Sequence, residues 1–182
     1  MRRQPPCGYR VAMLARKADR LQALAQVCPD AFAVPCDVSD DAALAAGLAH
    51  IGDVGGPPQV VVHNAVGGAP MQAAGSGAIL VTGNTASQRG RANFAGFAPT
   101  KAAQRILAES LARDLGPKGV HVAYLIIDAV IDVPWQRERM PNAPDDFFCS
   151  PASIAAEVFH LAHQPRDAWS FLAEVRPYRE TW

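Results

Sequence analysis

One stretch decides the fold class of this chain: GAILVTGNTASQRGRANFAGFAPTKAAQRILAESLARDL, residues 77–115. It opens with a short apolar run at 78–81 between two glycines, which predicts a buried strand. A polar, glycine-containing loop follows at 84–96. The helix after it is expected to end at Leu115, because a glycine and a proline come directly afterwards.

Three side chains in this stretch are candidates for a functional site. Asn84 follows the predicted strand, and Phe97 and Lys101 stand one helical turn apart where the helix begins. Strand, loop and helix are joined so that these three side chains converge near the carboxyl end of the strand. Ligands of open α/β sheets bind at that end. We therefore expect the site there.

The composition is that of an ordinary globular protein. The chain has 182 residues, of which 49% are hydrophobic and 19% charged, enough for one domain with a sizeable core. The 17 basic residues balance the 17 acidic ones, so charge favours neither nucleic acid nor an anionic membrane as partner. No apolar run is typical of a membrane span or signal peptide. We expect a single cytoplasmic domain over 1–182, with a polar leader at 1–8.

Cysteines and histidines give no metal-site pattern. No cysteine pair has Cys-x-x-Cys spacing, so reduced thiols are expected. His160 and His163 lie three residues apart on a predicted helix, but no third ligand stands nearby, and we expect no metal site. The cysteines are Cys7, Cys28, Cys36 and Cys149.

Strand and helix patterns alternate along the chain, which predicts an α/β fold with a mostly parallel sheet. The valines within 59–63 are typical of a parallel strand buried on both faces. Ser39 is the expected cap of a helix that runs to about Ile51. The expected strands are 9–15, 31–35, 59–63, 78–81, 121–127 and 169–175, and the expected helices are 19–27, 40–51, 97–115 and 151–163.

The stretch 77–115 resembles the short-chain dehydrogenase/reductase family. In that family a strand ends in Ser-Ser, and a Tyr-x-x-x-Lys motif opens the next long helix, thirteen positions after the catalytic Ser. Phe97-Ala98-Pro99-Thr100-Lys101 occupies the Tyr-x-x-x-Lys slot, and Asn84 occupies the Ser slot. Gly90 falls where the family carries a glycine. The lysine matches the family, and the Tyr and Ser positions do not.

Further motifs extend the resemblance and imply a Rossmann-like, doubly wound sheet. Residues 11–24 resemble the family's second strand and following helix, and Asp37-Val38 resembles the pair that meets the adenine ring. His63-Asn64-Ala65-Val66 keeps two of the four residues of the Asn-Asn-Ala-Gly turn. Residues 131–134 resemble the segment after the sixth strand. Trp169-Ser170-Phe171 is similar to the last strand of an atypical group with Phe in the Tyr position.

The resemblance implies a nicotinamide cofactor and a carbonyl or alcohol substrate. Phe97 has no proton to give, so activity is expected to be impaired, while Asn84 can still donate to a carbonyl oxygen. Arg16 stands where NADP-preferring relatives place a cation for the 2′-phosphate, which favours NADP over NAD. The implied catalytic residues are Lys101, Asn84 and Phe97, and the implied cofactor-binding residues are Arg16, Asp37, Val38, Asn64, Ala65 and Lys101.

Each of these side chains also has an ordinary structural interpretation. Asn84 is equally typical of a turn that ends a strand. Lys101 is as consistent with a solvated lysine in the first turn of a helix, and Arg16 with a surface cation. Asp37 fits a loop acid that precedes a helix. The functional and structural interpretations both stay open.

Two pieces of the family's pattern are missing. No strand and glycine-rich turn precede residue 9, although that turn receives the cofactor pyrophosphate in the family, so cofactor binding is in doubt. The missing strand is central in the order 3-2-1-4-5-6, so its neighbours either come together or leave a gap. Only residues 64–77 replace a long helix, with a short one expected near 70–74. The uncovered sheet face favours self-association.

Three functions follow as alternatives. The first is an atypical, catalytically impaired NADP-linked oxidoreductase. The second is a pseudoenzyme that serves as a binding or oligomerisation module. The third is a truncated gene product. The sequence does not name a substrate, because the segment 128–146, which would shape the pocket, is irregular.

Overall fold

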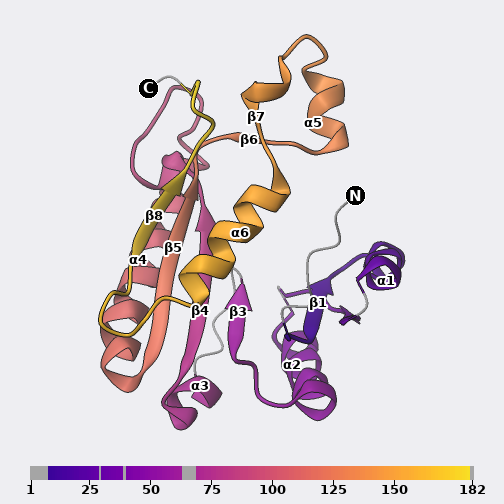
Figure 1. Ribbon diagram of the computed structural model, residues 1–182, viewed down its shortest axis with the longest axis vertical. Helices are drawn as coiled ribbons and strands as arrows, with labels where there is room; N and C mark the ends of the chain where they lie inside the picture. The colour runs from indigo at the N-terminus through magenta and orange to yellow at the C-terminus, as the bar shows by residue number, and fades with distance from the viewer. Residues whose placement is uncertain (1–7, 29, 39, 63–68, 181–182) are drawn as a thin grey trace. The chain divides into compact units, whose positions relative to one another are not determined.

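The computed structural model describes residues 8–28, 30–38, 40–62 and 69–180. The chain divides into two compact units, Met1–Pro58 and Gln59–Trp182. Both units combine parallel strands with helices (Figure 1), which confirms the predicted α/β class. The single domain expected over the whole chain stays a prediction.

The first unit is a two-stranded parallel sheet with two helices. β1 (Val11–Ala15) pairs with β2 (Ala31–Pro35), and Ala15 lies opposite Pro35. α1 (Ala18–Val27) joins the strands, and α2 (Asp41–Gly55) follows them. The sheet is β1-β2 alone among the described strands. The buried apolar side chains are Leu21, Val34 and Cys36.

The cap of α2 differs from the expected one. Asp40 is the N-cap, and its carboxylate accepts hydrogen bonds from the Ala42 and Ala43 amides at 2.9 and 3.1 Å. The predicted cap, Ser39, lies outside the described residues. The helix also continues to Gly55, beyond the expected end near Ile51. The three consecutive residues 39–41 are all good N-caps, so sequence pattern alone does not select one.

The second unit is a four-stranded parallel sheet. Its order is β3-β4-β5-β8, from β3 (Val60–Val62), β4 (Gly77–Gly83), β5 (Val120–Ile127) and β8 (Leu172–Val175). α4 (Ala98–Leu115) covers one face and α6 (Pro151–Ala162) covers the other (Figure 1). β5 has neighbours on both edges and both faces, which is why its first seven residues are buried.

The strand pairings of the described residues stay within each unit. β1 pairs with β2, and β3 pairs with β4, but no pairing joins β1 to β3 among the described residues. The helix in the described part of the β3–β4 connection is α3 (Ala69–Ala74), close to the predicted 70–74.

β3 is not buried on both faces, so that prediction was wrong. Among the described strands it pairs with β4 alone, and Val62 is 53% exposed. A valine run is typical of central strands, but position in the sheet depends on distant partners that local pattern does not reveal. His63 of the predicted strand lies outside the described residues.

The end of α4 is confirmed at Leu115, but the chain does not turn there. Gly116–Lys118 continues as a 3-10 turn, η2, and the left-handed residue is Gly119, with a φ of +83°. A side chain at Gly119 would overlap the Gly75 carbonyl, so only glycine fits this close approach.

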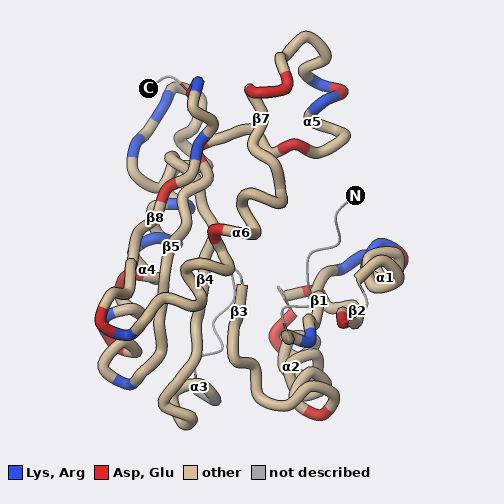
Figure 2. The backbone as a smooth tube through the Cα atoms, viewed as in Figure 1, with Lys and Arg blue, Asp and Glu red and all other residues tan. Residues whose placement is uncertain are grey.

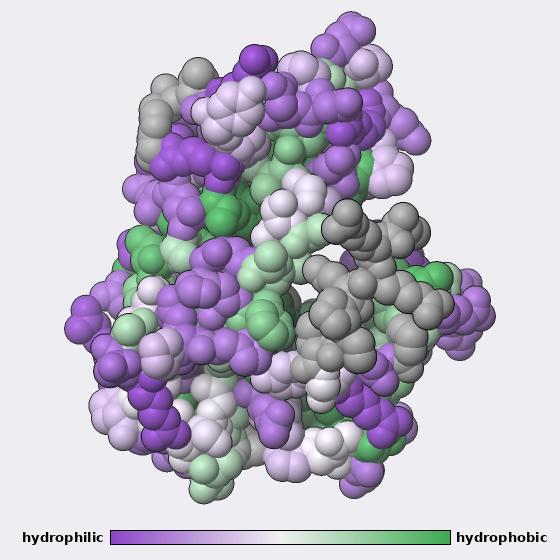
Figure 3. Space-filling view, viewed as in Figure 1, coloured by the Kyte–Doolittle hydropathy of each residue, from purple (hydrophilic) through white to green (hydrophobic). Residues whose placement is uncertain are grey.

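The irregular segment after β5 folds on itself around Arg137. It contains β6 (Val130–Ile131), α5 (Pro134–Arg139), η3 (Asp145–Phe147) and β7 (Phe148–Cys149). The Arg137 guanidinium donates to both carboxylate oxygens of Asp132, at 2.7 and 3.0 Å, and to Asp145 at 2.6 Å. These hydrogen bonds lower the pKa of Asp132. In Figure 3 this upper part of the molecule is mostly hydrophilic.

Candidate active site

The carboxyl ends of β4 and β5 bring polar residues together. Asn84 follows β4 and Asp128 follows β5, and these strands are parallel neighbours. The Thr85 hydroxyl donates to the Asp128 carboxylate at 3.2 Å across the strand ends. The Asn84 side-chain oxygen accepts from the Ala86 amide at 3.1 Å and caps the 3-10 turn η1 (Thr85–Ser87). The carboxamide NH₂ group of Asn84 is the donor that the proposed role requires.

Phe97 and Lys101 lie together at the start of α4. Phe97 is the N-cap residue, and Pro99 in the first turn favours a helix start here. The Lys101 ammonium lies 5.9 Å from the Phe97 ring centroid, so one helical turn places them on the same face. The Phe97 ring is 43% exposed and meets Phe94 edge-on. The Phe97 ring is thus available to a ligand from solvent, with the Lys101 ammonium beside it.

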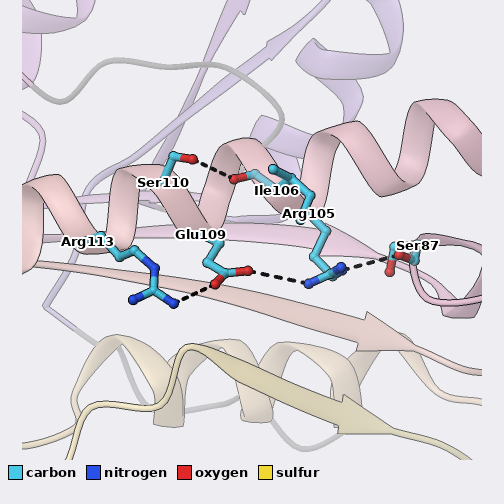
Figure 4. Close-up of polar contacts among 6 residues, drawn as sticks. All are labelled: Ser87, Arg105, Ile106, Glu109, Ser110 and Arg113. Carbon is cyan, nitrogen blue, oxygen red and sulfur yellow. Dashed lines mark hydrogen bonds and ion pairs between the residues drawn. The ribbon is translucent and has the colours of Figure 1, made fainter.

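α4 is anchored beside η1 by Arg105. The Arg105 guanidinium donates to the Ser87 carbonyl at 3.2 Å, and Glu109 pairs with both Arg105 and Arg113 (Figure 4). The Arg113 hydrogen bond lowers the pKa of Glu109. The Ser87 hydroxyl donates to the Asn84 carbonyl at 2.8 Å. These contacts fix the strand end that carries Asn84 relative to the helix that carries Lys101.

Two residues of this region were missed by sequence reasoning. The Gln104 carboxamide oxygen accepts from the Lys101 ammonium at 3.1 Å, and the Tyr124 hydroxyl approaches the same oxygen at 3.4 Å. Gln104 stands three residues after Lys101, a helical neighbour spacing that was available as a signal. Tyr124 lies in the buried strand β5, and a buried tyrosine hydroxyl usually has a hydrogen-bond partner.

A basic hollow of about 690 Å³ lies at the end of β1 in the first unit. Figure 2 shows the basic run that leads from β1 into α1. Asp37 and Val38 follow β2, and since β1 and β2 are parallel, they stand at the same sheet edge as Arg16. The hollow therefore fits a ligand with a negative charge and an apolar part. It is lined by Ala15, Arg16, Lys17, Arg20, Leu21 and Leu24.

The predicted site residues fall into two groups. Asn84, Phe97 and Lys101 belong to the second unit, whereas Arg16 and the pair Asp37-Val38 belong to the first. The predicted cofactor residues Asn64 and Ala65 lie outside the described residues. Within the described ranges, no three His, Cys, Asp or Glu side chains are grouped for a metal ion. None of the described helices has the length and apolar character to cross a bilayer.

Comparison with solved structures identifies the fold. No protein-family model matches the chain, and no curated protein matches it. A short-chain dehydrogenase from Rhodopseudomonas palustris is 28% identical, with a TM-score of 0.75 over 94% of this chain and 88% of that one. An alcohol dehydrogenase from the archaeon Thermococcus sibiricus, complexed with 5-hydroxy-NADP, is 22% identical, with a TM-score of 0.80 over 96% of this chain and 88% of that one.

The fold and site thus define a Rossmann-like α/β protein with its candidate residues at strand ends. Its likeness to solved short-chain dehydrogenases supports membership of the short-chain dehydrogenase/reductase family. An NADPH-bound short chain oxidoreductase from Pseudomonas aeruginosa PAO1, described as containing an atypical catalytic center, has a TM-score of 0.80. It is 18% identical over 95% of this chain and 88% of that one, so it shares the fold.

Proposed function

We propose that this chain is an NADP-dependent oxidoreductase of reduced activity that acts on a small carbonyl or alcohol substrate. One observation carries the proposal: the Lys101 ammonium lies 5.9 Å from the Phe97 ring, beside the strand end that carries Asn84. The nicotinamide, when bound, supplies hydride chemistry. Lys101 would bind the nicotinamide ribose, and the Asn84 amide would orient the carbonyl oxygen. Phe97 has an aromatic ring but no hydroxyl that could donate a proton, so we expect slow turnover.

The first unit would bind the adenosine end of the cofactor. Arg16, with Lys17 and Arg20 around the same hollow, suits the 2′-phosphate of NADP. Asp37 and Val38 would meet the adenine, and Asn64 and Ala65 are the further cofactor residues that the family pattern implies. The guanidinium of Arg16 distinguishes a phosphate from a hydroxyl by charge and by paired hydrogen bonds.

Fluorescence titration with NADPH and NADH tests this proposal. We expect NADPH to bind more tightly, and Arg16→Ala to weaken NADPH about tenfold while leaving NADH unchanged, since one charge-assisted contact is lost. Arg113→Ala, which removes an equally charged side chain from the exposed end of α4, is the control. Failure of wild-type protein to bind either nucleotide at millimolar concentration contradicts the proposal.

A non-catalytic oligomerisation module is the second candidate, favoured by the surface of α4. Ile106 and Leu107 are 51% and 53% exposed on this helix. Adjacent exposed apolar side chains favour association through the helix. This role requires no proton donor, which agrees with Phe97 at the Tyr position. It is compatible with cofactor binding.

Sedimentation velocity measures this association directly. We expect wild-type protein to sediment as a species larger than the 19.3 kDa chain, and Ile106→Glu/Leu107→Glu to shift it to the monomer. Val27→Glu, at an exposed apolar residue of α1, is the matched control and leaves the distribution unchanged. A monomeric wild type across the micromolar range argues against the module.

A further inference from the structure

A row of polar side chains leads from Lys101 into the core between α4 and β5. The Lys101 ammonium donates to the Gln104 carboxamide oxygen at 3.1 Å. The Tyr124 hydroxyl donates to the same oxygen at 3.4 Å. Lys101 and Gln104 are partly buried, and Tyr124 has no exposed surface. The lysine head group is thus connected to a side chain held by the core.

Tyr124, at the inner end of this row, is fixed by its packing in the core. The Tyr124 ring packs in the core cluster with Val81 and Ala108, and its hydroxyl lies against Gly83, where any side chain would overlap it. Ser87 also forms a hydrogen bond with the Tyr124 side chain. Burial raises the pKa of the Tyr124 hydroxyl, so it stays protonated and donates at neutral pH.

Such an arrangement costs free energy unless its partners are satisfied. A buried hydroxyl without hydrogen bonds is destabilising, whereas a phenylalanine would fill nearly the same volume without that demand. The Tyr124 hydroxyl therefore contributes through its polar contacts, which are Ser87 and, toward Lys101, Gln104. Gln104 in turn holds an ammonium group that would otherwise sample many rotamers.

We propose that Gln104 and Tyr124 are positioning residues that hold the Lys101 ammonium ready for the nicotinamide ribose. This inference rests on the proposed function, because Lys101 needs a bound cofactor to act upon. Fixing the lysine before binding lowers the entropy lost when the cofactor binds. Neither residue needs to touch the cofactor.

The test compares NADPH with adenosine 2′,5′-bisphosphate, which lacks the nicotinamide ribose. We expect Gln104→Leu to weaken NADPH about tenfold, the size of one charge-assisted hydrogen bond, and to leave the bisphosphate unchanged. Gln104→Glu, which keeps an acceptor, restores NADPH binding to within about threefold of wild type. Tyr124→Phe, which keeps the ring, weakens NADPH about threefold. Gln72→Leu, on the exposed surface of α3, is the matched control.

A double variant separates positioning from a general packing role. Lys101→Met is expected to weaken NADPH at least as much as Gln104→Leu, and Lys101→Met/Gln104→Leu no further, because Gln104 acts through the lysine. Additive losses overturn the inference. Equal loss of both ligands in Gln104→Leu and Tyr124→Phe also overturns it, since packing damage does not select the ribose.

The outcomes distinguish this inference from the function beneath it. Wild-type protein that binds neither ligand contradicts the proposed function itself. If Gln104→Leu binds NADPH as tightly as the wild-type protein does, only the positioning role is contradicted. We predict that Gln104→Leu weakens NADPH binding and leaves bisphosphate binding unchanged, and that Gln104→Glu binds NADPH nearly as well as the wild type.

Discussion

Phe97→Tyr is expected to raise the rate of NADPH-dependent carbonyl reduction by about 10² to 10⁴, the usual contribution of a general acid. The substitution adds a hydroxyl to a ring whose centroid lies 5.9 Å from the Lys101 ammonium. A nearby positive charge favours the phenolate and so lowers the pKa of a phenol. NADPH absorbance, followed with a panel of aldehydes and ketones, gives the rate.

Phe94→Tyr is the matched control for this gain. Phe94 meets Phe97 edge-on with ring centroids 5.9 Å apart, so it places a hydroxyl nearby without occupying the motif position. It should leave the rate unchanged. Phe97→Tyr/Lys101→Met should lose the gain, because the phenol loses its cation. A rate unaffected by Phe97→Tyr, in protein that binds NADPH, would show that the missing proton donor does not limit activity.

Gly83→Ala is expected to destabilise the second unit by about 1–3 kcal/mol, the usual cost of overpacking a core. A Cβ at Gly83 would overlap the Tyr124 hydroxyl and ring, and Tyr124 is completely buried, so it has little room to move away. Guanidinium unfolding followed by tryptophan fluorescence reports this unit, because Trp135, Trp169 and Trp182 all belong to it.

Gly90→Ala is the control, since a Cβ at Gly90 meets nothing within 4 Å. Replacing a glycine outside the left-handed region normally stabilises slightly, so its effect should be small or favourable. In the Tyr124→Leu background, whose shorter side chain lacks the overlapping atoms, Gly83→Ala should cost much less. An equal cost in both backgrounds would place the effect elsewhere than Tyr124.

Local pattern predicted most elements of the fold, because strand and helix signals are short-range. The strand 31–35 and the end of α4 at Leu115 match the structure. The exposure of β3 did not follow from sequence, because edge position is a property of the whole sheet. The choice of Asp40 as N-cap was undetermined because its neighbours are equally able to cap.

Sequence analysis predicted only those residues of the candidate site that belong to the motif. The spacing of Phe97 and Lys101 placed them one turn apart, and in the structure the Lys101 ammonium lies 5.9 Å from the Phe97 ring centroid. Tyr124 and Gln104 are twenty residues apart in the sequence, so local spacing does not predict that they interact. The catalytic and cofactor roles of all these residues remain predictions for the assays above.

Burial is distributed unevenly between the two units, and backbone opening should follow it. In the described residues, β5 is enclosed by β4, β8, α4 and α6, whereas the β1-β2 sheet rests on three buried apolar side chains. Amide protons of β5 therefore exchange with solvent last, and those of β1 and β2 exchange early. A nucleotide seated in the basic hollow would slow that early exchange by mass action.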